Sequence, residues 1–192
     1  MFSRPNGPRA RTITSGKHQR GAVAIEFAAL FGLFLVMVYA ILAYSLPMLL
    51  TLSFKQLSAD AARAAVQVDP KQAAGAYANT VAVQVADTIT SSWLPPNWRQ
   101  GNCPAPEADG HTWQALPATG GTSYGHLAID NSEPYDPRYL LRVCIQRKYN
   151  PTGNSDETAI IPTLNLLGFD IPMLPKDTNG DVTLRGYTSI RL

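Results

Sequence analysis

A long uncharged run near the N-terminus constrains this chain more than any other feature of its 192 residues. No charged side chain occurs from Phe27 to Leu52, and most residues in this run are apolar. As an α-helix these 26 residues would extend about 39 Å, which exceeds the ~30 Å hydrocarbon core of a bilayer. We therefore expect residues 22–54 to form one transmembrane helix.

The distribution of charge predicts the orientation of this helix. Five basic residues precede Gly21, whereas all fourteen acidic residues lie at or after Glu26. Without residues 1–21, eleven basic and fourteen acidic side chains remain, which is a formal charge of −3. Basic flanks stay on the cytoplasmic side, so the residues from Lys55 onward should be exported. The exported part is not basic, and nucleic-acid binding is not expected.

A cleavable secretory signal is the competing interpretation, since it also has a basic start and an apolar centre. Its apolar region is normally only ~7–15 residues long, and cleavage follows at a small-residue site. The run here is longer, and the later A-x-A at Ala59-Asp60-Ala61 lies in a segment that should be helical. The sequence therefore favours a retained helix over ordinary signal-peptide processing.

The order of residues before the apolar run is informative. A basic leader is followed by Gly21 and Ala22, and Glu26 and Phe27 then open the run. The stretch "RGAVAIEFAALFGLFLVMVYAIL" and the small-residue segment "SADAARAAV" resemble the TadE-like minor pilins, or pseudopilins, of the tight-adherence (Tad) pilus system. This resemblance covers about residues 20–68. It implies a prepilin leader at residues 1–21, cut after Gly21 by a prepilin peptidase to leave Ala22 as the N-terminus.

The resemblance also implies partners, a location and a role. The partners would be the peptidase, other Tad pilins with the inner-membrane assembly platform, and the lipid bilayer. The protein would cross the inner membrane once, with its C-terminal domain in the periplasm or in an extracellular pilus, and would act in pilus assembly or adhesion. No cofactor, metal or catalytic residue is implied. Major pilins of this system are shorter and often have Tyr where Phe27 stands, which favours a minor component. TadG-like relatives usually carry a bigger extracellular domain and fit less well.

Glu26 has a chemical role in this interpretation. Cleavage after Gly21 would create a charged α-amine on Ala22, one helical turn from the Glu26 carboxylate. In a low-dielectric setting the carboxylate could pair with that amine or with the amine of a neighbouring subunit, which would set the register of assembly. The alternative is an ordinary interfacial glutamate that needs no partner.

Residues 55–94 are expected to form an exported helical region. An alanine-rich apolar stripe should continue the first helix; its residues are Leu57, Ala61, Ala64, Ala65 and Val68. Asp69 as N-cap, Pro70 and Gln72 then predict a second helix that starts at Pro70 and ends near Ser92. Its predicted buried face is Ala74, Tyr77, Ala78, Val81, Val85 and Ile89. The segment "TVAVQV" also alternates as a strand does.

Residues 95–192 are expected to form a loop-rich β domain. Pro95-Pro96 should end the helical half, and a Pro/Gly-rich loop runs from Asn97 to Gly125. The segments "YLLRVCIQRKY" and "DVTLRGYTSIRL" then alternate as half-buried strands do. The second strand follows a predicted hairpin turn at Asn179-Gly180. Pro162 and Pro172 allow only short or edge strands between them. The expected fold is α+β, with a small antiparallel sheet packed on the long N-terminal helix.

The two cysteines, Cys103 and Cys144, are both in the exported part. Neither belongs to a C-x-x-C motif or to a Cys/His cluster with zinc spacing. They predict one disulfide in an oxidising compartment, and two buried free thiols are the alternative.

Three short motifs suggest other functions but lack the necessary context. The sortase-like "LPATG" has no apolar span and basic tail downstream, and "GTSYG" around Ser123 lacks the strand and helix of a nucleophile elbow. The calcium-loop-like "DTNGD" has its glycine one position early. A membrane-anchored enzyme would depend on Ser123 alone, and an uncleaved single-pass protein with an exported binding domain is the other alternative.

The basic residues of the predicted strands could form a binding strip. A solvated outer face is the expected interpretation. The residues concerned are Arg142, Arg147, Lys148, Arg185 and Arg191.

Overall fold

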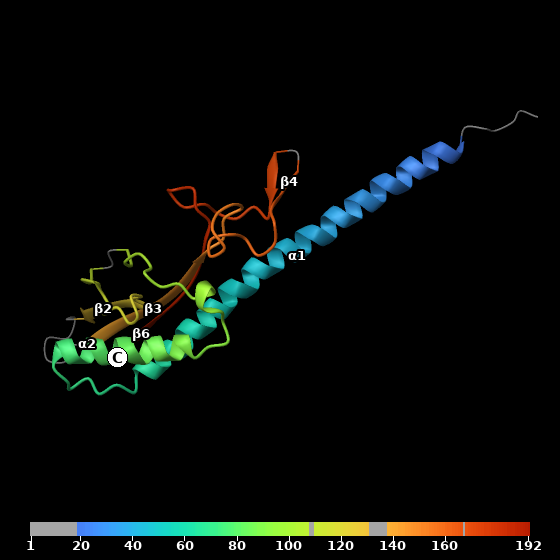
Figure 1. Cartoon of the computed structure of the whole chain (residues 1–192). Coiled ribbons are helices and arrows are strands. Elements are labelled where there is room, and N and C mark those ends of the chain that lie inside the picture. The colour runs from blue at the N-terminus through green and yellow to red at the C-terminus, as the bar shows by residue number, and fades with distance from the viewer. Residues whose placement is uncertain (1–18, 108–109, 131–137, 167) are drawn as a thin grey trace, which may run out of the picture. The chain divides into compact units, whose positions relative to one another are not determined.

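The computed structural model describes residues 19–107, 110–130, 138–166 and 168–192, so most of the predicted leader lies outside the described residues. The chain forms two compact units, Met1–Tyr39 and Ala40–Leu192. The described elements are the helices α1 (Gln19–Ala65) and α2 (Ala74–Thr90), the short 3-10 helix η1 (Pro96–Trp98), and the strands β1 (Gln114–Ala115), β2 (Gly125–Asp130), β3 (Arg138–Lys148), β4 (Leu164–Leu166), β5 (Phe169–Ile171) and β6 (Thr183–Arg191) (Figure 1). The α+β class predicted from the sequence is confirmed.

Helix α1 supplies the apolar segment that the sequence predicts. In the first unit every side chain from Val23 to Leu35 is exposed, although most of them are apolar. Among the described residues one helical stretch, Val23–Ala65, is long and apolar enough to cross a membrane, with a mean hydropathy of 2.4 in its most apolar part. An exposed helix that is apolar on all sides fits a lipid environment better than water.

One face of α1 becomes covered by protein in the second unit. The buried residues recur at intervals of mostly three and four, as expected for one face of a helix. They are Ala43, Pro47, Leu50, Phe54, Ser58, Ala61, Ala62 and Ala65. The alanine stripe is confirmed at Ala61 and Ala65, and it extends farther toward the N-terminus than the sequence suggested. Small side chains on this face allow the sheet to approach the helix closely.

The main sheet has four antiparallel strands in the order β1-β2-β3-β6. The two longest pairings join β3 to β2 and to β6, with Leu141 opposite both Leu127 and Ile190. The strands β3 and β6 match the two predicted alternating segments, and the short pair β4-β5 matches the prediction of short strands. Strand β2 was not predicted. Its residue Gly125 lies so close to β3 that a Cβ would meet the Arg142 carbonyl oxygen, a contact that no local pattern reveals.

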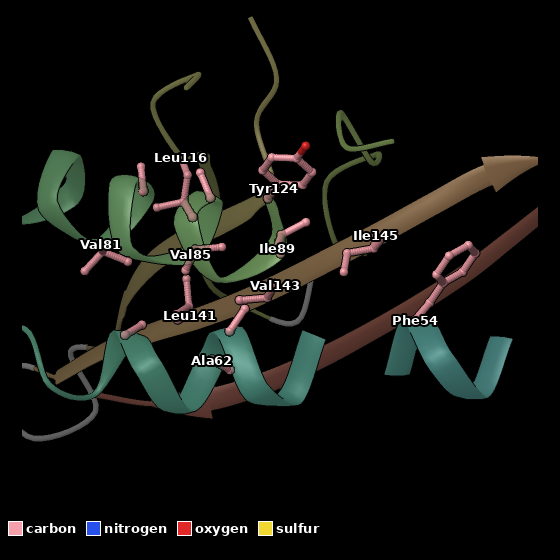
Figure 2. Close-up of a cluster of buried hydrophobic side chains, with 14 of the residues drawn as sticks. Phe54, Ala62, Val81, Val85, Ile89, Leu116, Tyr124, Leu141, Val143 and Ile145 are labelled. Carbon is pink, nitrogen blue, oxygen red and sulfur yellow. The ribbon is translucent and has the colours of Figure 1, made fainter. Parts of the chain in front are cut away.

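Both helices cover the same face of this sheet. The Tyr77 ring of α2 packs against the Tyr139 ring of β3 in a tilted arrangement, with ring centroids 4.7 Å apart. The Ser58 hydroxyl of α1 lies 2.9 Å from the Thr188 hydroxyl of β6, and Thr188 is opposite Val143. Figure 2 shows side chains from α1, α2 and β3 meeting in one buried cluster. Burial of each large aliphatic side chain stabilises the fold by about 1.5–3 kcal/mol.

Helix α2 begins later than the sequence predicts. The Asp69 carboxylate accepts a hydrogen bond from the Lys71 amide, 2.9 Å away, and so closes a local turn instead of capping a helix. The helix starts at Ala74, and its N-cap residue Ala73 makes no side-chain cap. The predicted face is confirmed, since Val81 and Val85 are fully buried. The strand alternative for "TVAVQV" is wrong because these residues are helical.

The contact between α1 and β6 depends on a glycine. A Cβ at Gly186 would lie 2.5 Å from the backbone atoms of Phe54 and Lys55. We predict that Gly186→Ala lowers the free energy of unfolding by about 1–3 kcal/mol, because the helix must move away from the strand. Chemical denaturation of the full chain in detergent, followed by near-UV circular dichroism, measures this loss.

Gly75→Ala is the matched control, because nothing lies within 4 Å of a Cβ at that helical position. It should leave stability unchanged or raise it by up to about 1 kcal/mol. Equal stability of the two variants would contradict the close contact between α1 and β6.

Candidate assembly site

The residues predicted to form the processing and assembly site all lie in the first part of α1. Because the helix begins at Gln19, Gly21 and Ala22 are helical. Glu26 lies four positions after Ala22, so the two residues are about 6 Å apart along the helix axis. Glu26 and Phe27 are both exposed. The helix thus places Glu26 one turn from the predicted new N-terminus, on a surface open to lipid or to another subunit.

The surroundings of Glu26 are almost entirely apolar. It is the one charged residue from Gly21 to Phe54 in the sequence. Its neighbours Val23, Ile25 and Phe27 are exposed, and the Phe27 ring stacks on Phe31 with centroids 6.0 Å apart. A carboxylate among such side chains is costly in lipid unless a cation compensates it. The chemistry available here is therefore the pairing of one anion with one cation.

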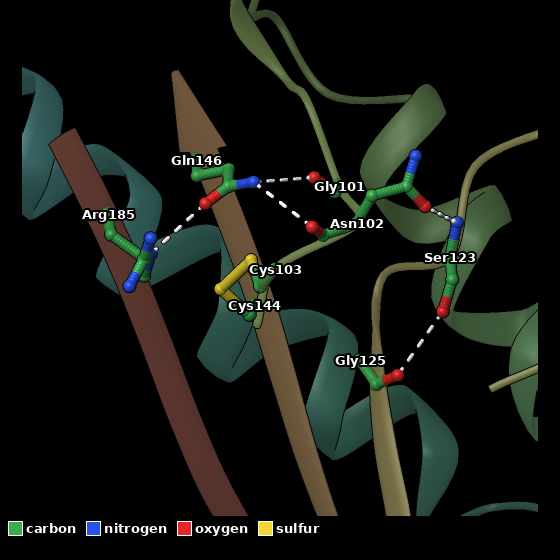
Figure 3. Close-up of a disulfide and its surroundings, with 8 residues drawn as sticks. All are labelled: Gly101, Asn102, Cys103, Ser123, Gly125, Cys144, Gln146 and Arg185. Atoms are coloured by element: carbon green, nitrogen blue, oxygen red, sulfur yellow. Dashed lines mark hydrogen bonds between the residues drawn. A yellow bond between two sulfur atoms is a disulfide. The ribbon is translucent and has the colours of Figure 1, made fainter. Parts of the chain in front are cut away.

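The predicted disulfide is present in the α+β domain. Cys103 and Cys144 are bonded, with their Cα atoms 6.3 Å apart and a sequence separation of 41. Cys144 lies on the face of β3 opposite the helices, and the Gln146 side chain beside it donates to the carbonyl of Gly101 at 2.9 Å (Figure 3). The disulfide and this hydrogen bond hold the Pro/Gly-rich loop against the sheet. The alternative of free thiols is wrong for this structure.

Ser123 does not have the geometry of a nucleophile elbow. Strand β2 follows it, whereas an elbow requires a helix there. The Ser123 hydroxyl donates to the Gly125 carbonyl at 3.2 Å, and the Ser123 amide donates to the Asn102 side chain at 3.0 Å (Figure 3). Both groups are used in holding the loop in place. Leu116 of the sortase-like motif is buried in the core.

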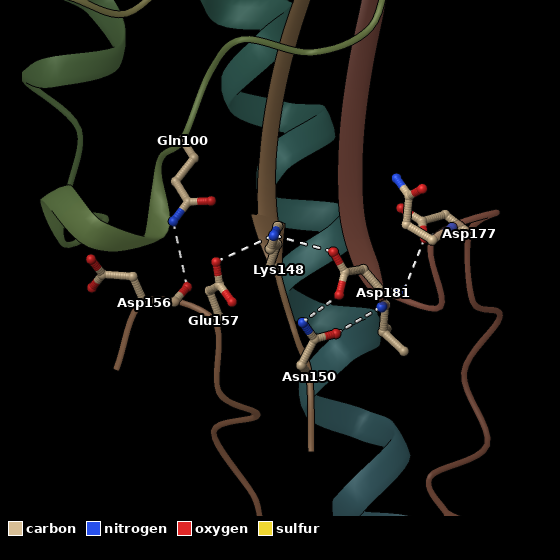
Figure 4. Close-up of polar contacts among 9 residues, drawn as sticks. Gln100, Lys148, Asn150, Asp156, Glu157, Asp177 and Asp181 are labelled. Carbon is tan, nitrogen blue, oxygen red and sulfur yellow. Dashed lines mark hydrogen bonds and ion pairs between the residues drawn. The ribbon is translucent and has the colours of Figure 1, made fainter. Parts of the chain in front are cut away.

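The calcium-loop-like segment forms a closed turn. The Asp177 carboxylate accepts hydrogen bonds from the amides of Asn179 and Asp181, both at 2.9 Å. The Asp181 carboxylate also pairs with the Lys148 ammonium group at 3.2 Å. It accepts a hydrogen bond from the side-chain amide of Asn150 at 3.0 Å (Figure 4). Its carboxylate is thus already engaged. The hairpin prediction is wrong, because β6 pairs with β3 and not with the strand that precedes the turn.

Lys148 holds two segments of the domain together. Its ammonium group lies 3.2 Å from the carboxylates of both Asp181 and Glu157 (Figure 4). These hydrogen bonds, first to Asp181 and then to Glu157, raise the pKa of Lys148. Lys148 is half-buried, with 40% of its side chain exposed, so the interpretation of a solvated outer face holds in part for this residue.

Arg147 departs from that interpretation, because it is only 2% exposed. Its guanidinium lies 5.1 Å from the centroid of the Trp98 ring and 5.9 Å from that of Tyr149, and it donates to the Thr158 carbonyl at 3.0 Å. Burial lowers the pKa of Arg147. The signal was present in the sequence: Arg147 continues the alternation of Leu141, Val143 and Ile145, and this alternation places it on the core face.

The described residues do not bring together a metal site. No group of three or more His, Cys, Asp or Glu side chains in the described ranges could hold a metal ion.

The exposed apolar helix and the fold fit a single-pass membrane protein with an α+β domain. A family model described as TadE-like protein matches residues 21–63, which lie entirely within α1. This match confirms the resemblance found in the sequence and supports a TadE-like protein of Tad pilus systems. No curated protein and no solved structure matches the chain.

The disulfide gives a prediction about stability. Replacing both cysteines, as Cys103→Ser with Cys144→Ser, should lower the free energy of unfolding by about 4 kcal/mol, because a loop of 41 residues is no longer closed in the unfolded chain. Urea denaturation of the full chain in detergent measures this difference.

Reduction of the native protein with dithiothreitol should reproduce the loss, and the double variant should not respond to the reductant. Identical midpoints for the oxidised native protein and the variant would show that the bond does not stabilise the domain.

Proposed function

We propose that this protein is a minor pilin, or pseudopilin, of a Tad-type pilus, and that a prepilin peptidase cuts it after Gly21. The observation that carries the proposal is the position of Glu26, a single carboxylate one helical turn after Ala22 on an exposed apolar helix. The family match supports it, since it begins at residue 21, the residue before the proposed cut.

The proposed topology follows from the charges and from the burial pattern. The basic leader, residues 1–21, stays in the cytoplasm, the helix of residues 22–54 serves in the membrane and in assembly, and residues 55–94 and 95–192 are periplasmic. From Val23 to Leu42 α1 has little protein cover, and Ala43 is the first fully buried residue. These 20 residues extend about 30 Å, which matches the hydrocarbon core. The disulfide fits an oxidising periplasm.

In the proposed mechanism, cleavage creates the cation that Glu26 requires. The new α-amine of Ala22 pairs with Glu26 of its own helix while the subunit is in the bilayer. During assembly the carboxylate pairs instead with the Ala22 amine of a neighbouring subunit. An unpaired charge between packed apolar helices is strongly disfavoured, so only the register that forms this pair is stable. The assembly platform and the other Tad pilins are the proposed partners, and the exported domain provides the surface for assembly or adhesion.

The cleavage is tested by the N-terminus of the mature protein. When the chain is produced together with a prepilin peptidase, intact-mass analysis should give a polypeptide that begins at Ala22. Gly21→Glu should leave the chain intact, whereas Gly32→Ala, in the same helix, should not affect cleavage. A chain that still begins at Met1 would favour an uncleaved single-pass protein, and a cut beyond Leu52 would contradict the pilin proposal.

The role of Glu26 is tested separately. Glu26→Ala should still be cleaved, but its incorporation into sheared pili should fall by at least about tenfold, since loss of a pair in low dielectric costs more than ~1.4 kcal/mol. Quantitative immunoblotting of the pilus and membrane fractions measures this ratio.

Glu26→Asp keeps the charge and should restore part of the incorporation, and Met37→Ala serves as a control at an exposed apolar position of the same helix. Normal incorporation of Glu26→Ala would remove the register role.

A further inference from the structure

The short β4-β5 pair has one apolar face and one polar face. Its register places Leu164 opposite Ile171, and Leu166 opposite Phe169. Side chains alternate along a strand, so these four lie on one face. Between them, the Asn165 side chain donates to the Asp170 carboxylate across the strands at 3.0 Å, on the other face. The polar side chains of Asn165 and Asp170 are therefore hydrogen-bonded to each other, and the apolar face takes no part in this contact.

Three of the four apolar side chains are open to the surroundings, whereas Ile171 is half-buried. Leu164 is 47% exposed, Leu166 43% and Phe169 63%, and the nearby Met173 is 61% exposed. In a soluble domain such a face usually packs on the core, and a two-stranded pair without a packed face is marginal in water. The exposed side chains therefore require an apolar environment outside the protein.

A hydrogen bond fixes where this pair lies along α1. The Met173 amide donates to the Tyr44 hydroxyl at 2.8 Å. Tyr44 precedes Lys55, the first charged residue after Glu26, by 11 residues, or about 16 Å along the helix. The β4-β5 pair thus lies beside the uncharged part of α1, and tyrosine is a residue that favours the membrane interface.

The face of α1 near Tyr44 is also apolar and exposed. Ile41, Met48, Leu49 and Leu52 are each more than half exposed. The apolar surface of the β4-β5 pair thus continues that of the helix within one compact unit. Lipid is the occupant that this continuity favours, because Tyr44 lies only two residues beyond the proposed hydrocarbon-spanning segment, Val23–Leu42, where α1 passes through the outer part of the bilayer.

We propose that the β4-β5 pair inserts Leu164, Leu166 and Phe169 into the membrane leaflet nearest the exported domain, beside α1. This second contact restricts rotation of the domain about the helix and fixes which face it presents while the subunit is in the bilayer. The inference rests on the proposed membrane insertion of α1 and does not depend on cleavage or on pilus assembly.

The test uses the full oxidised chain in phosphatidylcholine vesicles, with one environment-sensitive fluorophore attached to an introduced cysteine. Phe169→Cys reports on the β4-β5 pair, Leu33→Cys on α1, and Val83→Cys, at an exposed position of α2, is the matched control. The native cysteines are protected in their disulfide. Lipids that carry a nitroxide on the acyl chain quench only fluorophores that lie in the bilayer, and iodide quenches only those in water.

The proposal expects nitroxide quenching at position 169 that is severalfold stronger than at position 83 and close to that at position 33. Quenching at 33 but not at 169, with 169 open to iodide, would overturn it. Protection of 169 from both quenchers would indicate that a second protein copy covers the face, and would also overturn it. Loss of quenching at 33 would instead refute the membrane insertion of α1.

Discussion

The close packing of α1 on β6 is the interaction on which the exported domain depends. At Gly186 the strand approaches the helix backbone near Phe54, and the hydroxyl groups of Ser58 and Thr188 pair where their side chains meet. This contact allows the small alanines of α1 to lie against the sheet, and α2 then completes the core on the same face. The helix that provides the exposed apolar segment is thus also the helix on which the domain folds, so the domain cannot keep its core without it.

The two faces of the sheet stabilise different parts of the domain. The face toward the helices contains the aliphatic cluster and, at its end, the buried guanidinium of Arg147 between two aromatic rings. The opposite face carries Cys144 and the polar side chains that hold the Pro/Gly-rich loop. Stability from burial is therefore concentrated on one side, while the other side holds down a segment that has few regular hydrogen bonds of its own. This division explains why a domain with a small sheet can support a long loop.

The elements that the sequence predicts correctly are those determined by residues close together in the chain. The uncharged run predicted α1, and the alternation in two segments predicted β3 and β6. The positions of Gly21 and Glu26 led to the proposed assembly site. Strand β2 was missed because its place is set by the contact of Gly125 with another strand. The start of α2 was wrong because the Asp69 carboxylate closes a turn with the Lys71 amide. The partner proposed for Glu26 would lie on another molecule, so neither the sequence nor one copy of the chain can contain it.

The disulfide has a mechanical consequence. Cys103 and Cys144 enclose the whole of β1 and β2 and much of β3. In the proposed pilus, tension would enter each subunit through its N-terminal helix, and the covalent bond would carry that tension directly from residue 103 to residue 144. The enclosed segment therefore adds nothing to the length that the chain can gain when pulled. A pulled domain can therefore unfold at β6 or at its helices, whereas the Pro/Gly-rich loop, β1 and β2 between the two cysteines bear no tension.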